Sequence, residues 1–210
     1  MISNKLATLM AERKIKATRL SSDTGIARST ISSLTNNDSK MIQFDTINTL
    51  CQYLNVTPAD FFIYSPYDVS IDIETTKVDA YSYTNEVLEW EQKVQVYEAD
   101  VFAKFTKRGQ TISVVEMSAK LDSPVTHKGA EDFPLDENDE IDINIDDSSS
   151  PTFQEAWDKY FSEIELLSSL ETKFRQILQE KVTAALNTAS DSTDFSSWTV
   201  STLGLPVLPF

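Results

Sequence analysis

The sequence predicts an all-α N-terminal domain of five helices, followed by an α+β C-terminal domain with an antiparallel hairpin-based sheet and long C-terminal helices. Apolar residues recur at helical spacing through residues 1–64, alternate along segments of residues 65–150, and return to helical spacing after Ser150. The expected parts are a helical domain over 1–64, a linker and first strand over 65–80, an α+β domain over 81–187 and an apolar C-terminal tail over 188–210.

Composition excludes several classes of protein. The 210 residues are 40% hydrophobic, which is enough for a packed core. A single cysteine, Cys51, excludes an intramolecular disulfide. Because the chain has only one histidine as a further soft ligand, no zinc site is expected. Four glycines fit neither a Walker loop nor a dinucleotide fingerprint, so we expect no metal and no cofactor. No apolar run reaches the ~18 residues of a membrane span and no secretory signal is visible, so we expect a cytoplasmic protein that meets no membrane.

Charge is unevenly distributed along the chain. Residues 1–64 carry seven Lys or Arg and five Asp or Glu, a net charge of +2. The other 146 residues hold 18 − 7 = 11 basic and 33 − 5 = 28 acidic residues, a net charge of −17. A polyanionic partner would therefore meet the N-terminal segment, and the acidic remainder would be repelled by it.

Five short helical segments are visible in residues 1–64. Gly25 lies between the second and third segments, where a tight turn requires positive φ or a close approach. Thr57-Pro58 is an N-cap followed by proline at the first position of a last short helix. The apolar residues that repeat at a spacing of three or four, or close the core, are Leu6, Leu9, Met10, Leu20, Ile31, Leu34, Phe44, Ile47, Leu50, Cys51, Leu54, Phe61 and Phe62.

Two stretches of this segment resemble a known family. One runs Leu-Ser-Ser-Asp-Thr-Gly-Ile-Ala-Arg-Ser-Thr-Ile-Ser over residues 20–32, and the other runs from Phe44-Asp45-Thr46-Ile47 through Leu54-Asn55-Val56-Thr57-Pro58 to Phe61-Phe62. The turn glycine, the core aliphatics and the closing Leu-x-Val-x-Pro are in register. Residues 5–63 therefore resemble the lambda/Cro-type helix-turn-helix domain (XRE family) of phage repressors and related bacterial regulators.

The resemblance implies binding to double-stranded DNA. In such folds the third helix lies in the major groove and its outward residues touch base edges. Arg28 alone can form a bidentate contact with guanine, and the flanking polar residues can reach phosphates. The expected DNA-binding set is Thr18, Arg19, Arg28, Ser29, Thr30, Ser32, Ser33, Asn36, Asn37 and Lys40.

The sequence departs from the family where two helices begin. Lys16 and Ala17 stand where the family often has a threonine cap and a glutamine that touches the DNA backbone, and Ala27 replaces the usual Ser or Thr cap of the third helix. We expect each helix start to be weaker by roughly 1 kcal/mol, with some loss of phosphate contacts.

Alternating patterns predict strands in the middle of the chain. Val69, Ile71 and Ile73 indicate a first strand, and Asn85 to Gln92 is expected to form a short helix. Tyr97 to Phe105 and Ile112 to Leu121 predict a β-hairpin with a bulge near Val114-Val115. Ile141, Ile143 and Ile145 predict a third strand. The acidic stretch 131–147 is expected to be a solvated loop and edge strand; a calcium loop fails on spacing, and a DNA-mimicking surface is the other alternative.

Helical spacing after Ser150 indicates one helix with a phase slip or two helices in series. Ser150-Pro151 is the expected start, and Ser168 with Glu171 fits a capping box. The stripe could be core, or it could hold two subunits together. The expected oligomerisation residues are Trp157, Tyr160, Ile164, Leu167, Phe174 and Leu178. The apolar tail is expected to dock on the protein.

No catalytic residues are expected. Many repressors of this family carry a self-cleaving serine–lysine domain, but here Ser118 follows Met117 and the glycine bond is Gly129-Ala130, the wrong order. The expected protein is a transcriptional repressor of phage or mobile-element type that binds palindromic operators as a homodimer or higher oligomer. The alternatives are an antitoxin or adaptor whose C-terminal domain binds a protein, and a ligand-gated regulator with a pocket lined by Trp90, Trp157 and Tyr160.

Overall fold

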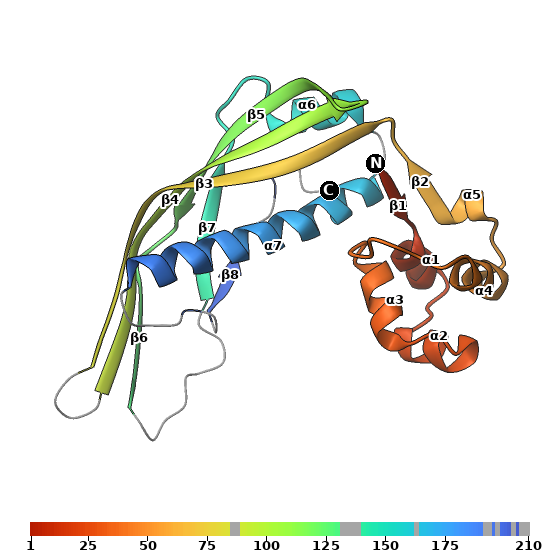
Figure 1. Ribbon diagram of the computed structural model, residues 1–210, viewed down its shortest axis with the longest axis horizontal. Coiled ribbons are helices and arrows are strands. Elements are labelled where there is room, and N and C mark those ends of the chain that lie inside the picture. The colour runs from red at the N-terminus through yellow and green to blue at the C-terminus, as the bar shows by residue number, and fades with distance from the viewer. Residues whose placement is uncertain are drawn as a thin grey trace. The chain divides into compact units, whose positions relative to one another are not determined.

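A computed structural model describes residues 1–84, 89–130, 140–161, 164–190, 195, 198–202 and 205. The chain divides into two compact units, which are described separately here (Figure 1). The first unit comprises Met1–Asp68 with Phe161–Lys173, and the second comprises Val69–Tyr160 with Phe174–Phe210. None of the described helices is long and apolar enough to cross a membrane.

The first unit contains five helices and two short strands within residues 1–64. In chain order the elements are β1 (Ile2–Asn4), α1 (Leu6–Glu12), α2 (Ala17–Thr24), α3 (Arg28–Thr35), α4 (Phe44–Leu54), α5 (Pro58–Phe61) and β2 (Phe62–Tyr64). Strands β1 and β2 pair antiparallel, with Ile2 opposite Tyr64 and Asn4 opposite Phe62. The expectation of an all-α domain is therefore wrong, because three-residue strands are too short to show an alternating pattern in the sequence.

The core of the first unit is made by one apolar face from each helix. Leu6, Leu20, Ile31, Leu50 and Phe61 are fully buried in one cluster. Phe44 was expected on this face, but its side chain is 87% exposed because it occupies the first position of α4, before the helix reaches the core. The helical spacing correctly predicted the rest of the α4 face.

The second unit contains a curled sheet whose described strands are β3 (Tyr67–Thr84), β4 (Glu89–Lys107), β5 (Gln110–Leu121), β6 (Val125–Ala130), β7 (Glu140–Asp146) and β8 (Thr199–Ser201) (Figure 1). The strand order is β3-β4-β5-β7-β8, and β6 pairs with β4 beside β5. The sheet is mixed, since β8 lies parallel to β7. The antiparallel, hairpin-based sheet expected from the sequence is therefore wrong: β8 returns after a long helical connection, which permits parallel pairing.

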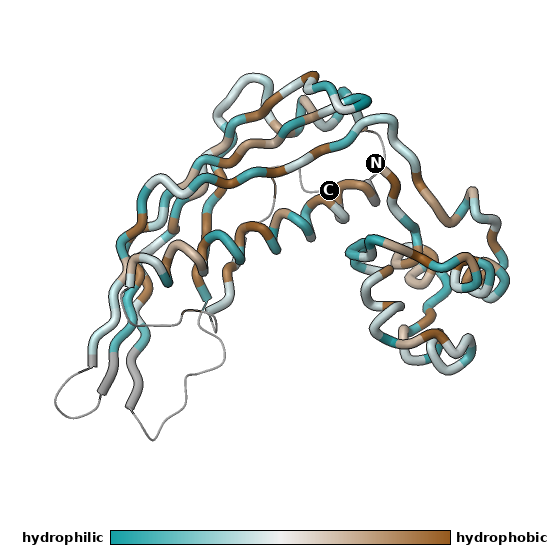
Figure 2. The backbone as a smooth tube through the Cα atoms, viewed as in Figure 1, coloured by the Kyte–Doolittle hydropathy of each residue, from teal (hydrophilic) through white to brown (hydrophobic). Residues whose placement is uncertain are grey.

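Strands β4 and β5 form the hairpin that the sequence predicts. Along β4, Tyr97, Val101 and Phe105 are fully buried, and hydrophobic and hydrophilic residues alternate along the tube in Figure 2. The register shifts after Phe105, which leaves Ile112 as the extra residue on β5. The bulge expected at Val114-Val115 is thus misplaced, because Val114 is simply an apolar residue on the outer face, 39% exposed.

The helix expected over Asn85 to Gln92 is contradicted where the structure describes it. Residues 89–92 belong to β4 and pair with β6, with Gln92 opposite His127. Residues 85–88 lie outside the described part of the chain, as do residues 131–139 of the acidic stretch. The remainder of that stretch begins β7, where Ile141 and Ile143 are buried as predicted.

Two described helices lie between β7 and β8 along the chain, and only the second is long: α6 (Phe153–Tyr160) and α7 (Ile164–Ala189). Helix α6 begins after Thr152, whose hydroxyl accepts a hydrogen bond from the Glu155 N–H at 3.2 Å while its N–H donates to the Glu155 carboxylate at 3.0 Å. The expected start at Ser150-Pro151 is therefore two residues early. Helix α7 runs without interruption through residue 168, so the predicted capping box of Ser168 and Glu171 is wrong.

The C-terminal segment docks on the second unit, as the sequence predicts. Phe195, Trp198 and Leu205 are buried. Gln179 of α7 donates to the Trp198 carbonyl at 2.8 Å and accepts from the Val200 N–H at 2.7 Å. The Trp198 indole N–H donates to the buried Gln92 amide oxygen of β4 at 2.8 Å. Polar bonds from α7 and β4 thus fix the path of β8.

Candidate nucleic-acid interface

The turn between α2 and α3 is rigidly built from its own side chains. Gly25 ends α2 at φ 74°, a conformation that glycine adopts without strain; no neighbouring atom lies within 4 Å of the position of a Cβ there. Ser21 donates to the Ile26 carbonyl at 2.7 Å, and the Thr24 hydroxyl accepts from the Ile26 N–H at 3.3 Å. Residue 26 is therefore held on both sides, and α3 begins in a defined direction.

Helix α3 presents a buried face and a polar face. Ile31 and Leu34 are buried in the core of the first unit. Arg28, Ser29, Thr30 and Ser32 are exposed, and Ser33 is half-buried. No ion pair with another described residue holds the Arg28 guanidinium. The sequence-predicted reading residues are thus brought together on one helix, which the turn at Gly25 positions.

The flanking residues differ in what they can offer. Thr18, Arg19, Asn36 and Lys40 are exposed, as phosphate contacts must be. Asn37 is half-buried, and its amide is hydrogen-bonded to Asn4 on both its oxygen and its nitrogen. Asn37 stays a prediction as a DNA contact, but its amide is already engaged by Asn4 on both its oxygen and its nitrogen.

Arg19 is oriented by a second helix. Its Nε lies 3.4 Å from Asp23 Oδ2, one turn further along α2, and the Tyr53 hydroxyl of α4 donates to the same oxygen at 2.7 Å. The hydrogen bond to Asp23 raises the pKa of the Tyr53 hydroxyl above its usual value. Neither Asp23 nor Tyr53 was expected to take part, since residues 30 positions apart give no local signal in a sequence.

A groove of about 450 Å³ borders the polar face of α3. Its walls come from α3 and from the segment that leads into α4. The lining residues are Ser29, Thr30, Ser33, Leu34, Ser39, Met41, Ile42, Gln43 and Thr46. Met41 is 89% exposed on its rim. The groove extends the polar surface of α3 with hydroxyl and amide groups that can donate to or accept from DNA.

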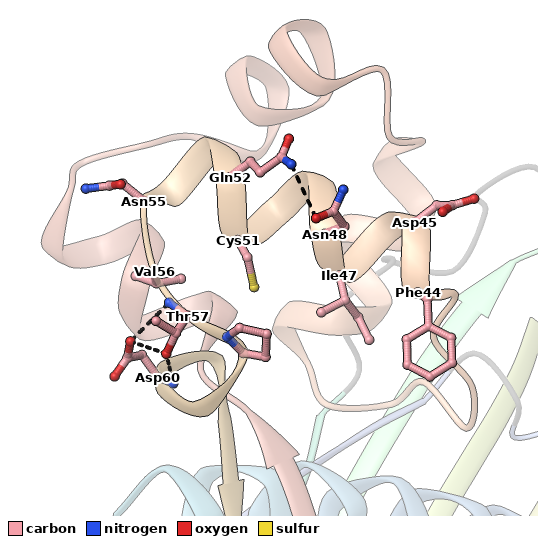
Figure 3. Close-up of a pocket in the computed structure, with 11 residues that line it drawn as sticks. Phe44, Asp45, Ile47, Asn48, Cys51, Gln52, Asn55, Val56, Thr57 and Asp60 are labelled. Atoms are coloured by element: carbon pink, nitrogen blue, oxygen red, sulfur yellow. Dashed lines mark hydrogen bonds between the residues drawn. The ribbon is translucent and has the colours of Figure 1, made fainter.

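Helix starts confirm part of the sequence reasoning. The N-caps of α2 and α3, Lys16 and Ala27, make no side-chain capping bond, as their residue types predict. Helix α5 has a capping box, in which the Thr57 N–H donates to Asp60 Oδ2 at 3.0 Å and the Thr57 hydroxyl oxygen accepts from the Asp60 N–H at 3.3 Å (Figure 3). The Thr57 hydroxyl also donates to Asp60 Oδ2 at 2.6 Å. These bonds to Thr57 lower the pKa of the Asp60 carboxyl below its usual value.

A second groove, of about 740 Å³, runs along α4 and α5 (Figure 3). Its lining includes Phe44, Ile47, Cys51 and Pro58, and it includes no residue of α2 or α3. Burial raises the pKa of the Cys51 thiol, with a smaller contribution from Asp60. The thiol is therefore neutral at physiological pH, and this groove is separate from the polar face of α3.

The family described as Cro/C1-type HTH DNA-binding domain matches residues 5–67. Residues 5–67 are a Cro/C1-type helix-turn-helix DNA-binding domain. This match supports a DNA-binding function for that segment of the chain. A solved structure of a protein from Bacteroides fragilis, described as DNA-binding, is similar to this chain at 25% identity and a TM-score of 0.28, over 30% of this chain and all of the other. None of the curated proteins compared with the chain matches it.

The residues expected to join two subunits lie outside the Cro/C1-type domain and mostly inside the protein. Trp157 and Leu167 are buried, and Phe174 and Leu178 are fully buried within one chain. Tyr160 is half-buried, its ring 5.6 Å from that of Phe105, and the side chain of Ile164 lies outside the described part. This burial favours the account in which the stripe belongs to the core of a single chain.

The expected aromatic ligand pocket cannot be assembled from the described side chains. Trp157 stacks on Phe153, with ring centroids 6.1 Å apart, and is buried. Trp90 lies on β4, opposite Gly129 of β6, and its side chain lies outside the described part.

Proposed function

We propose that this chain is a sequence-specific transcriptional repressor of phage or mobile-element type, which acts in the cytoplasm and binds palindromic operators as a homodimer. The observation that carries the proposal is the polar face of α3, where one exposed arginine, Arg28, stands among short hydroxyl side chains. A guanidinium can bind guanine through two hydrogen bonds, and hydroxyls can bind any base or a phosphate. A helix of this composition can distinguish base sequences.

Dimerisation is proposed from the charge of the DNA-binding domain. A net charge of +2 over residues 1–64 supplies few phosphate contacts. Two domains in one molecule raise the effective concentration of the second at its half-site, which multiplies affinity without new contacts. The second unit, with its net negative charge, supplies the oligomerisation or sensing function in this proposal. Because Phe174 and Leu178 are core residues, we do not assign the subunit contact to them.

No catalytic step forms part of the proposal. Self-cleaving repressors need a serine nucleophile with a lysine base. Here Ser118 lies in β5, and the lysine of the same strand, Lys120, is two residues further along. Alternate residues of a strand share a face, but the chain offers no Ala-Gly bond to cut, since Gly129 precedes Ala130. Incubation of the purified protein at pH 7 to 10, followed by mass spectrometry, should leave the chain intact.

The test is selection of genomic DNA fragments by the purified full-length chain, followed by footprinting of the bound fragments. We expect one or a few discrete sites with twofold sequence symmetry, each protected by two copies of the chain. Analytical ultracentrifugation of the complex with a single site gives the number of copies. Binding that is uniform over all fragments would overturn sequence specificity. Protection of an asymmetric site by one copy would overturn the dimer.

A further inference from the structure

The N-terminal strand β1 is joined to the helices of the DNA-binding domain by one buried side-chain amide, that of Asn4. Asn4, the last residue of β1, is 8% exposed. Its backbone pairs with Phe62 of β2. Its side chain points between α1 and α3, which are far apart in sequence from one another. The residue lies just before the matched family segment 5–67, so nothing in the family match assigns it a role.

The Asn4 side-chain amide joins the start of α1 to the end of α3. Its oxygen accepts from the Leu6 N–H at the start of α1, at 3.0 Å. Its nitrogen donates to the Leu34 carbonyl in the last turn of α3, at 2.9 Å. A helix start offers free N–H groups and a helix end offers free carbonyls, so one amide satisfies both. An apolar side chain would remove the acceptor of the buried Leu6 N–H and would leave the Leu34 carbonyl with its bond from the Asn37 N–H, at 3.1 Å, and a carboxylate could not donate to Leu34.

Asn37 and Asn4 are hydrogen-bonded to each other in both directions, and this pair is called the clasp below. Asn37 follows α3 in a left-handed conformation, φ 53°, which asparagine tolerates better than most residues. Its oxygen accepts from the Asn4 N–H at 2.9 Å and from the Asn4 amide at 2.7 Å, and its nitrogen donates to the Asn4 carbonyl at 3.2 Å. Four hydrogen bonds therefore tie the end of α3 and the residue after its C-cap to β1.

We propose that Asn4 is a positioning residue for base reading: through Leu34 and Asn37 it fixes the C-terminal end of α3, while the turn at Gly25 fixes the other end. The inference rests on the proposed function in taking α3 as the reading helix. Hydrogen bonds to base edges require donor and acceptor within a few tenths of an ångström, whereas contacts to phosphates tolerate movement of a long side chain. Loosening the end of α3 therefore reduces specificity more than it reduces general affinity for DNA.

The experiment compares two variants of the full-length chain with a matched control. Asn4→Ala removes the amide that joins the helices. Asn37→Gly removes the other amide and keeps the backbone, since glycine adopts φ near 53° without strain. The control, Thr57→Ala, removes the cap of α5 and touches neither β1 nor α3. Circular dichroism sets a temperature at which all three variants are folded.

The measured quantity is the ratio of affinity for the selected operator to affinity for a random duplex of equal length. We expect Asn4→Ala and Asn37→Gly each to lower operator affinity roughly tenfold and random-duplex affinity by less than about twofold. The double variant should lose little more than either single variant, because the two amides act as one unit. Thr57→Ala should leave the ratio unchanged.

Each outcome is decisive for one of the two claims. If the unaltered chain binds the operator and the random duplex equally, the proposed function fails. If the unaltered chain is specific and Asn37→Gly keeps its ratio, the positioning role of the clasp is overturned, even if Asn4→Ala does not fold. A ratio that falls as much in Thr57→Ala as in the two clasp variants also overturns it, since the loss then follows from stability alone.

Discussion

Among the exposed side chains of α3, only Arg28 is long and charged; its neighbours Ser29, Thr30 and Ser32 end in a hydroxyl one bond from Cβ. The Arg28 guanidinium therefore supplies five N–H hydrogen-bond donors to the exposed face of α3, in a fixed planar arrangement. Hydroxyl groups rotate and accept as readily as they donate, so they discriminate weakly. The preference for one base at one position of the operator should therefore depend on Arg28 alone.

The first prediction concerns Arg28. Arg28→Ala should weaken operator binding by about 1–3 kcal/mol and relax the preference at one base position in each half-site, because a bidentate contact is lost. A titration against operators with every single-base change measures both effects. Arg13→Ala, which removes the same charge outside α2 and α3, should leave base preference unaltered. Equal preference profiles for Arg28→Ala and the unaltered chain would contradict the prediction.

A second prediction concerns acid sensitivity at the start of α5. The carboxylate of Asp60 is stabilised by Thr57, so its pKa is lower in the folded chain than in the unfolded chain. Its contribution to the free energy of unfolding is complete above the unfolded pKa, near 3.8, and disappears as the pH falls through the lower folded pKa.

Nuclear magnetic resonance of the Asp60 carboxyl checks this directly. Its titration midpoint should lie below that of an unfolded aspartate in the unaltered chain, and it should move upward in Thr57→Ala. A midpoint that does not move would show that Thr57 is not the cause.

At the scale of elements, the helix starts explain where the DNA-binding domain is weak. Helix α5 has both bonds of a capping box, whereas α2 and α3 start with Lys16 and Ala27 and have no side-chain cap. The first N–H groups of α3 are then left to solvent. In the proposed function these same groups lie beside the face of α3 that meets DNA.

The third prediction follows from this missing cap. Ala27→Ser should increase the free energy of unfolding by roughly 0.5–1 kcal/mol, because the serine oxygen can accept from an N–H in the first turn of α3. Urea denaturation of the full-length chain, followed by circular dichroism, measures the change. Ala11→Ser makes the same replacement in the last turn of α1, where no free N–H is available, and should be neutral or slightly destabilising.

Local sequence patterns predicted elements that bury a regular stripe. The core of α1 to α4, the hairpin of β4 and β5 and the buried face of β7 were visible in this way. Patterns failed where apolar residues occur on an outer face, as at Phe44 and Val114, and where a strand is three residues long, as at β1. The candidate site followed the same rule: α3 was predictable, but Asn4, which contacts it from 30 residues away, was not.

At the scale of the whole molecule, the two units differ in which segments of the chain complete their cores. The core of the DNA-binding domain is closed by residues 6–61. The second unit needs β4, the part of α7 from Phe174 onward and the C-terminal segment together, since Gln92, Gln179 and Trp198 are joined by hydrogen bonds. Changes in the second unit outside α7 should therefore leave the core formed by residues 6–61 intact.

The fourth prediction separates core from subunit interface in α7. Phe174→Asp should lower the free energy of unfolding of the second unit by at least about 3 kcal/mol, because a charge replaces a fully buried ring. Gln176→Asp introduces the same side chain on the exposed side of the helix and should have little effect. Urea denaturation followed by tryptophan fluorescence reports on this unit, which holds all three tryptophans.

Sedimentation completes that test. A Phe174→Asp chain that keeps its strand content and only halves in mass would instead place Phe174 at a subunit contact.

The fifth prediction is that residues 1–68 fold alone. The fragment contains the complete α1–α5 core and both strands of the small sheet. It should be helical by circular dichroism, monomeric, and weaker than the full chain in binding the operator, because it lacks the second unit. An unfolded fragment would show that the domain depends on later parts of the chain.

The bond between Trp198 and Gln92 spans 106 residues, which sets an order of events during synthesis. The first domain has its whole core when the ribosome has passed residue 61, whereas the sheet of the second unit waits for β8 and the indole near the end of the chain. Long-range contacts of this kind form slowly. We therefore expect each nascent chain to hold a finished DNA-binding domain before it can acquire whatever control the second unit exerts.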